Sequence, residues 1–122
     1  QQWQANLLRE IRPKRLYTAY DTKDDLEPLI EAGKKLRSAG FKPMSHTMCC
    51  YVLCGYEEDS FEEAEKRMHQ TMQAGFVPYA MLFRNEEGRT DAKWRRFQRE
   101  WCRPIITGKK FNEYWAERSG EQ

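Results

Sequence analysis

Apolar residues follow two alternating patterns along the chain. Segments 15–20, 46–54 and 78–83 are short and almost continuously apolar, which is typical of strands buried on both faces of a parallel sheet. Segments 25–39 and 60–74 instead carry apolar residues every three or four positions, which indicates amphipathic helices. The pattern therefore predicts the order strand, helix, strand, helix, strand.

An internal repeat supports this order. The motif Ala-Gly-Phe-x-Pro occurs at 39–43 and again 35 residues later at 74–78. Gly40 and Gly75 are placed to end the preceding helices in the left-handed conformation, and the proline beyond each glycine prevents the helix from continuing. Two strand-helix units of this length match βαβ crossovers, which take about 30 residues or more.

The starts of the two helices carry capping signals. Ser60 and Glu63 match a capping box, and Asp25 is placed to cap the earlier helix, with Pro28 inside its first turn. Each helix is therefore expected to begin directly after a short acidic turn.

Further helices are expected over 3–11 and 91–103, so that residues 1–106 form one α/β domain and residues 107–122 a partly helical tail. The expected fold is a parallel three-stranded βαβαβ unit flanked by helices, with two unpaired sheet edges. Either the flanking helices cover these edges, or the edges pair with another chain, or the unit is half of a barrel. The repeat length suits a barrel and a doubly wound sheet equally well.

Composition narrows the class of protein. The 122 residues are 33% charged and 39% hydrophobic, which indicates a folded domain, and a net charge of +2 does not demand a polyanionic partner. No apolar run approaches the roughly 20 residues of a membrane helix, so no membrane association is expected. The chain begins with Gln1, which suggests a processed form or a piece of a longer protein.

The cysteines do not form a convincing site. Three of the four, Cys49, Cys50 and Cys54, crowd one predicted strand, unlike the spacing of a secreted disulfide framework, and a cytoplasmic location is expected. In a strand Cys50 and Cys54 lie about 13 Å apart, too far to share a metal ion. These residues are interpreted as buried thiols. Neither His46 nor His69 has a nearby Ser or Cys in a nucleophile-elbow context, and no phosphate-binding glycine motif is present.

A ligand site is expected where the strands end and the helices begin. This rule selects the loops 20–22, 55–59 and 84–85. Asp21 is placed to bind a sugar hydroxyl or to cap the turn, and the sequence leaves both open. The acidic turn 57–60 suits a metal or ribose, but favourable electrostatics at a helix start explain it better.

The segment 91–103 carries basic and aromatic residues together. Trp94, Phe97 and Trp101 share one helical face, which favours an amphipathic helix docked on the sheet over a surface that stacks nucleic-acid bases. The alternative function is a small interaction module that binds nucleic acid through basic residues here and nearby. Those residues are Arg95, Arg96, Arg99, Lys109 and Lys110.

The run from RLYTAYDTKDDLEPL to WRRFQREWCRP resembles the C-terminal half of a radical S-adenosylmethionine (radical SAM) protein. The resemblance covers roughly residues 1–106 and is closest to short phage and bacterial members described as Fe–S oxidoreductases. It implies the fourth to sixth strands of a partial (β/α)6 TIM-type barrel. The family's loose GxIxGxxE motif falls on 51–58, where Gly55 and Glu58 match, Leu53 is a fair substitute and Tyr51 departs from the first glycine.

The resemblance also implies a cofactor site. Tyr20 and Asp21 would approach the ribose or methionine part of S-adenosylmethionine, and the end of the second predicted strand and segment 81–83 would line its adenine. The implied cofactor-binding residues are Tyr20, Asp21, Leu53, Gly55, Glu58, Met81 and Phe83.

One departure from the family matters most. The family holds its [4Fe–4S] cluster on a CxxxCxxC loop, and this sequence has none. We therefore expect a chain with no catalytic or metal-binding residues of its own that is inactive alone and binds neither cofactor stably. Its expected partner is the missing N-terminal half-barrel, or a second copy through exposed strand edges.

Overall fold

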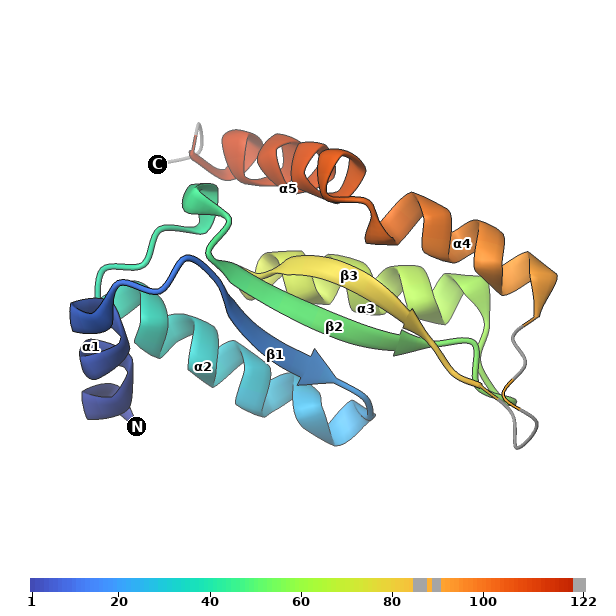
Figure 1. Cartoon of the computed structure of the whole chain (residues 1–122), viewed down its shortest axis with the longest axis horizontal. Coiled ribbons are helices and arrows are strands. Elements are labelled where there is room, and N and C mark those ends of the chain that lie inside the picture. The colour runs from blue at the N-terminus through green and yellow to red at the C-terminus, as the bar shows by residue number, and fades with distance from the viewer. Residues whose placement is uncertain (85–87, 89–90, 120–122) are drawn as a thin grey trace.

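The computed structural model describes residues 1–84, 88 and 91–119. Five α-helices and three strands alternate along this part of the chain (Figure 1). They are α1 (Gln2–Ile11), β1 (Leu16–Tyr20), α2 (Leu26–Ser38), β2 (Met48–Cys54), α3 (Phe61–Gln73), β3 (Val77–Leu82), α4 (Ala92–Cys102) and α5 (Pro104–Ser119), with single 3-10 turns η1 (Lys23–Asp25) and η2 (Pro43–Ser45).

The three strands form one parallel sheet in the order β1-β2-β3. Ala19, Tyr51 and Tyr79 lie side by side across it, which fixes the register. The predicted α/β class and the parallel βαβαβ unit flanked by helices are therefore confirmed.

Helices α2 and α3 both cover the same face of the sheet (Figure 1). This arrangement follows from the right-handed crossover that parallel strands favour, which returns each connecting helix to the same side. The residues of β2 that point toward these helices, Met48, Cys50, Val52 and Cys54, are almost completely buried. We call this side the covered face.

The opposite side, which we call the open face, contradicts the prediction that the strands are buried on both faces. Tyr17, Tyr51 and Met81 expose 50%, 38% and 46% of their surface there. Both crossover helices lie on the covered face, so α2 and α3 do not cover these residues, whereas Cys49 and Val77 at the amino end of the open face are buried.

Helix α4 runs along β3, and α5 packs beside it (Figure 1). Phe97 and Trp101 of α4 are buried, which confirms the interpretation of 91–103 as a helix docked by its aromatic residues. The Gln98 amide nitrogen donates a hydrogen bond to the Ala80 carbonyl oxygen of β3 at 3.3 Å. Helix α5 begins at Pro104 and buries Phe111, so one helix spans the expected boundary between domain and tail.

The helix ends follow most of the predicted signals. Gly40 and Gly75 adopt φ of 109° and 100°, the left-handed conformation, and the Ser60 hydroxyl accepts a hydrogen bond from the Glu63 amide at 3.1 Å. Asp25 departs from its expected role, because its side chain makes no cap bond to α2. Within the described residues, no helix is long and apolar enough to cross a membrane.

Candidate functional site

The loops after β1 and β2 enclose a pocket of about 490 Å³ at the carboxyl edge of the sheet, which we call the rim pocket. Asp21 and Lys23 line it from the first loop, and Glu58 lines it from the second. Glu63 and Lys66 add charges from α3. This pocket occupies the position at which parallel α/β folds bind ligands.

The loop after β1 is closed by a carboxylate. Asp25 accepts hydrogen bonds from the backbone amides of Asp21 and Thr22 at 2.9 and 3.0 Å. These two bonds lower the pKa of the Asp25 carboxyl, because they stabilise its charged form. Asp25 therefore closes the turn, and the side chain of Asp21 remains exposed at the pocket.

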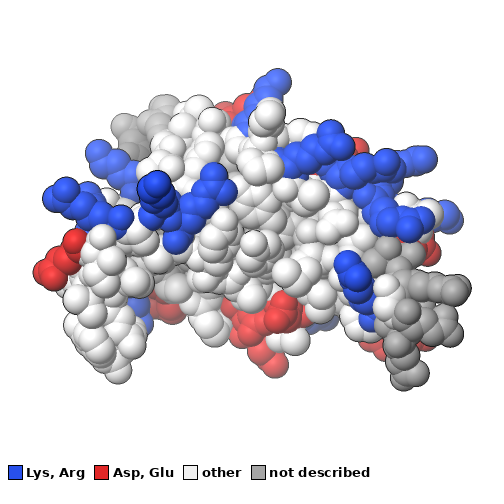
Figure 2. Space-filling model, viewed as in Figure 1, with Lys and Arg blue, Asp and Glu red and all other residues white. Residues whose placement is uncertain are grey.

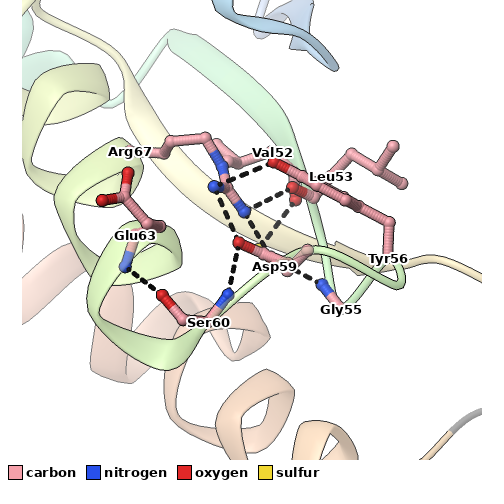
Figure 3. A network of polar contacts seen from close by, with 9 residues as sticks. Val52, Leu53, Gly55, Tyr56, Asp59, Ser60, Glu63 and Arg67 are labelled. Carbon is pink, nitrogen blue, oxygen red and sulfur yellow. Dashed lines mark hydrogen bonds and ion pairs between the residues drawn. The ribbon is translucent and has the colours of Figure 1, made fainter.

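The loop after β2 is closed by a buried ion pair (Figure 3). The Asp59 carboxylate, whose side chain is 0% exposed, accepts hydrogen bonds from the backbone amides of Gly55 and Ser60 at 2.8 and 2.9 Å. It also pairs with the Arg67 guanidinium of α3 at 2.6 Å. One carboxylate thus fixes both ends of the loop to the helix that follows.

Arg67 extends this network to the strand. It donates hydrogen bonds to the Leu53 carbonyl oxygen at 3.1 Å and to the Tyr56 hydroxyl at 3.4 Å (Figure 3). Burial is the largest single influence and lowers the pKa of Arg67, but the hydrogen bond and the charge attraction with Asp59, together with smaller contributions from Cys54 and Tyr56, outweigh it, so the pKa is raised. Sequence reasoning missed Arg67, although a cation beside the apolar stripe of an amphipathic helix is a usable signal.

The structure shows which residues of the acidic turn 57–60 serve the helix start and which are exposed. Asp59 is fully engaged by Arg67 and the backbone, and the Ser60 hydroxyl caps α3. Only Glu57 and Glu58 remain as exposed carboxylates of this turn, and of these Glu58 lines the rim pocket.

Gly55 is required by the backbone and by its neighbour. It adopts φ of 82°, and a Cβ atom there would lie 3.0 Å from the Trp94 ring of α4. The match of Gly55 to the family motif therefore also has a local structural explanation.

The seven residues implied by the resemblance divide between two places. Tyr20, Asp21 and Glu58 line the rim pocket, but Tyr20 is 3% exposed and its hydroxyl donates to the Gln70 amide oxygen at 2.9 Å. The other side chains lie toward the open face or at its end. Leu53 is half-buried and next to Met81, and Phe83 is exposed two residues beyond Met81. Gly55 begins the loop after β2 and lies against the Trp94 ring of α4.

A second surface, which sequence reasoning did not single out, lies on the open face. Tyr17, Tyr51 and Tyr79 come from the three adjacent strands. The Tyr17 and Tyr51 rings stack at 5.2 Å and 12°, and the Tyr51 and Tyr79 rings lie 6.4 Å apart at 48°. We call these three side chains the tyrosine face. The presence of a tyrosine in each of the three predicted strands was the available signal.

A pocket of about 340 Å³ lies against the tyrosine face. Arg15, just before β1, and Gln98 of α4 also line it, and no carboxylate does. A hydrogen bond with the Tyr17 hydroxyl raises the pKa of Arg15. This pocket is therefore aromatic and basic, whereas the rim pocket carries charges of both signs.

Basic side chains border the open face on two sides, and Asp and Glu gather along its lower edge in Figure 2. Figure 2, which views the open face, shows Lys and Arg gathered on the side formed by α4 and α5 and again near the amino end of β1, with uncharged surface between. Arg95, Arg96 and Arg99 are exposed on α4, whereas Phe97 and Trp101 of the same helix are buried and not free to stack bases.

No side chains of the described segments form a metal centre: no group of three or more His, Cys, Asp or Glu residues is placed to hold a metal ion there. Comparison of the chain with protein-family models, with curated proteins and with solved structures finds no match.

Proposed function

We propose that the chain is the carboxyl-terminal, three-stranded part of a partial α/β barrel of the radical SAM type, which contributes part of the S-adenosylmethionine and substrate site. The observation that carries the proposal is the one-sided sheet. Both crossover helices lie on the covered face, and the open face presents Tyr17, Tyr51 and Met81. In a barrel the helices lie outside and such a face lines the interior.

The two sheet edges differ in a way that supports the proposal. Helix α4 runs along β3, and Gln98 satisfies the Ala80 carbonyl of that strand. In the order β1-β2-β3, strand β1 has a strand on one side only, so further barrel strands would add beside β1. The missing half-barrel is the expected partner.

The residues present fit S-adenosylmethionine in part. Leu53, Met81 and Phe83 offer apolar contacts for adenine at the carboxyl end of the open face, and Asp21 and Glu58 offer carboxylates to hydroxyl groups at the rim. Tyr20 does not fit, because its buried hydroxyl is bonded to Gln70 of α3, so we assign it a supporting role.

The residues present do not fit a [4Fe–4S] cluster. The Cys50 and Cys54 side chains are buried on the covered face, and burial raises their pKa values to about 12 and about 11, which disfavours the thiolates that a cluster needs. The complete protein would cleave S-adenosylmethionine reductively with a cluster held elsewhere. This chain is inactive alone.

The test compares the chain alone with the chain joined to its upstream coding sequence. We expect a CxxxCxxC motif within roughly the preceding 100–150 residues, given about 35 residues per βα unit. We also expect S-adenosylmethionine cleavage only by the joined protein after iron–sulfur reconstitution. Stoichiometric cluster formation by the 122-residue chain would overturn its assigned inactivity, and an upstream sequence without the motif would overturn the family assignment.

Self-association of the isolated chain is part of the same proposal. An uncovered aromatic face and an unpaired β1 edge favour association with a second copy when the rest of the barrel is missing. Light scattering over a concentration series should show dimers or larger species that disappear in the joined protein. A strict monomer at high concentration would contradict this part.

A further inference from the structure

We infer that the tyrosine face binds a nucleotide unit, with the base against Tyr51 and Tyr79 and the phosphate at Arg15. This inference goes beyond the proposed function, since it concerns Arg15 and the tyrosines in the middle and amino-terminal part of the open face. Met81, which the proposed function places against the adenine of S-adenosylmethionine, lines the carboxyl-terminal side of the same pocket. The inference rests on the rings, the charge and the size of one pocket.

The rings provide the surface for the base. Tyr51 is at the centre of the sheet, and its ring stacks on Tyr17 on one side and leans toward Tyr79 at 6.4 Å on the other. Tyr51 and Tyr17 are nevertheless 38% and 50% exposed, so they do not serve as core residues. Aromatic side chains exposed on a sheet whose helices lie behind it are a recurring platform for stacking bases.

The charge provides the place for the phosphate. Arg15 is exposed, lines the pocket and contacts Tyr17 through its hydroxyl. The ion pairs of the described residues do not involve Arg15, and no Asp or Glu lines this pocket. A guanidinium without an internal carboxylate, next to stacked rings, matches the chemistry of a nucleotide.

The other groups add hydrogen-bonding capacity to this surface. Three tyrosine hydroxyls and the Gln98 carboxamide surround the rings. Gln98 uses its amide nitrogen on the Ala80 carbonyl, and its amide oxygen is chemically able to accept a hydrogen bond from an amino group of a base. A pocket of about 340 Å³ has the size of a site for one small ligand.

This location differs from the nucleic-acid interface suggested by the basic residues of α4. Phe97 and Trp101 of that helix are buried in the core, so they are not free to stack bases beside its arginines. The tyrosine face combines both requirements in one pocket. Arg96, which is exposed on α4 and does not line this pocket, provides a matched control cation.

The experiment is equilibrium binding by calorimetry to adenosine 5′-monophosphate, adenosine, ribose 5-phosphate and a single-stranded hexanucleotide. We expect the monophosphate to bind more tightly than either of its halves. Tyr51→Ala should weaken binding about tenfold or more, because stacking on one aromatic ring contributes this much per base, whereas Tyr51→Phe should retain most of the affinity. Arg15→Gln should weaken binding of the monophosphate but not binding of adenosine. Trp3→Ala and Arg96→Gln, which alter an exposed ring and a cation elsewhere, should change nothing.

Comparison of the ligands in this experiment identifies the source of the nucleotide. If the hexanucleotide binds more tightly than its six nucleotides would if each bound independently, and if its affinity falls as salt rises, the ligand is single-stranded nucleic acid. Equal affinity per nucleotide identifies a free nucleotide, and both results support the inference. The inference is overturned if none of these ligands binds up to about 1 mM, if folded Tyr51→Ala binds like wild type, or if S-adenosylmethionine displaces the monophosphate. Because S-adenosylmethionine cleavage by the joined protein is measured separately, failure here leaves the proposed function standing.

Discussion

The two faces of the sheet use the same strands and the same kinds of residue at different depths. Met48 on the covered face is 1% exposed, and Met81 on the open face is 46% exposed. Arg67 is buried and paired with Asp59, whereas Arg15 is exposed and paired with no carboxylate among the described residues. The comparison teaches that the covered face carries the stability of the fold and leaves the open face available for ligands.

The largest difference in unfolding free energy should be between variants of the two arginines. Arg67→Ala leaves the Asp59 carboxylate buried without its cation, and breaking a buried pair in this way costs about 3–5 kcal/mol of unfolding free energy. Arg15→Ala removes an exposed cation and should change the unfolding free energy by no more than about 0.5 kcal/mol. Urea denaturation followed by circular dichroism measures both variants.

A double variant tests whether the loss of stability comes from the unpaired charge of Asp59. Arg67→Met with Asp59→Asn removes both charges, so it should recover a large part of the stability lost in Arg67→Ala. If Arg67→Ala is as stable as wild type, the ion pair does not fix the loop after β2. In that case the contrast between the two faces fails at its strongest point.

The second comparison uses two methionines, one on each face of the sheet. Met48→Ala opens a cavity beneath α2 and α3 and should cost about 2–5 kcal/mol, whereas Met81→Ala removes contacts that are largely solvated and should cost less than about 1 kcal/mol. Thermal unfolding of the two variants under the same conditions tests this. Equal losses would mean that the open face is covered in solution, for instance by a second copy of the chain.

The sequence was sufficient for the features that local chemistry determines. Alternating patterns gave the order of strands and helices. The glycines of the repeated motif gave the helix ends, and Ser60 gave the start of α3. Each of these depends on residues within a few positions of one another, which is why a single sequence contains the signal.

The features that depend on tertiary arrangement were not predictable in the same way. The run MCCYVLC is apolar throughout, so nothing local shows that Tyr51 faces solvent while Val52 faces a helix. The pair of Asp59 and Arg67 joins a loop to the second turn of a helix, and many other charges in the chain offered equally plausible partners. Asp25 has the sequence of a helix cap, yet its carboxylate turns back to the preceding loop.

The third comparison concerns thiols and gives a pH dependence. Cys50 and Cys54 on the covered face have pKa values raised by burial to about 12 and about 11, above the ordinary thiol value of 9.0. Their contribution to stability is complete below pH 9 and is lost as pH rises toward the folded values, because only the unfolded thiols lose protons there. Between pH 9 and 11 the unfolding free energy should fall by up to about 1.4 kcal/mol per pH unit for each thiol.

The control for this dependence is a matched deletion of a thiol outside the covered face. Cys50→Ala with Cys54→Ala should flatten the fall in stability between pH 9 and 11, and Cys102→Ala should keep the wild-type slope. Denaturation midpoints at several pH values provide the measurement. A double variant with the wild-type slope would show that these thiols are not shielded from solvent in the folded state.

The smallest effect on stability should come from Asp25, the exposed counterpart of Asp59. Asp25 also accepts two backbone amides at the end of a strand, but it lies in an exposed loop. Since these bonds lower the pKa of Asp25 below the ordinary carboxyl value of 3.8, its contribution to stability is present above that value and is lost as pH falls through the folded value. Asp25→Asn should therefore be slightly less stable than wild type at neutral pH and should converge with it in acid. A loss as large as that of Arg67→Ala would mean that the hydrogen bonds, and not their burial, determine how strongly each loop is held.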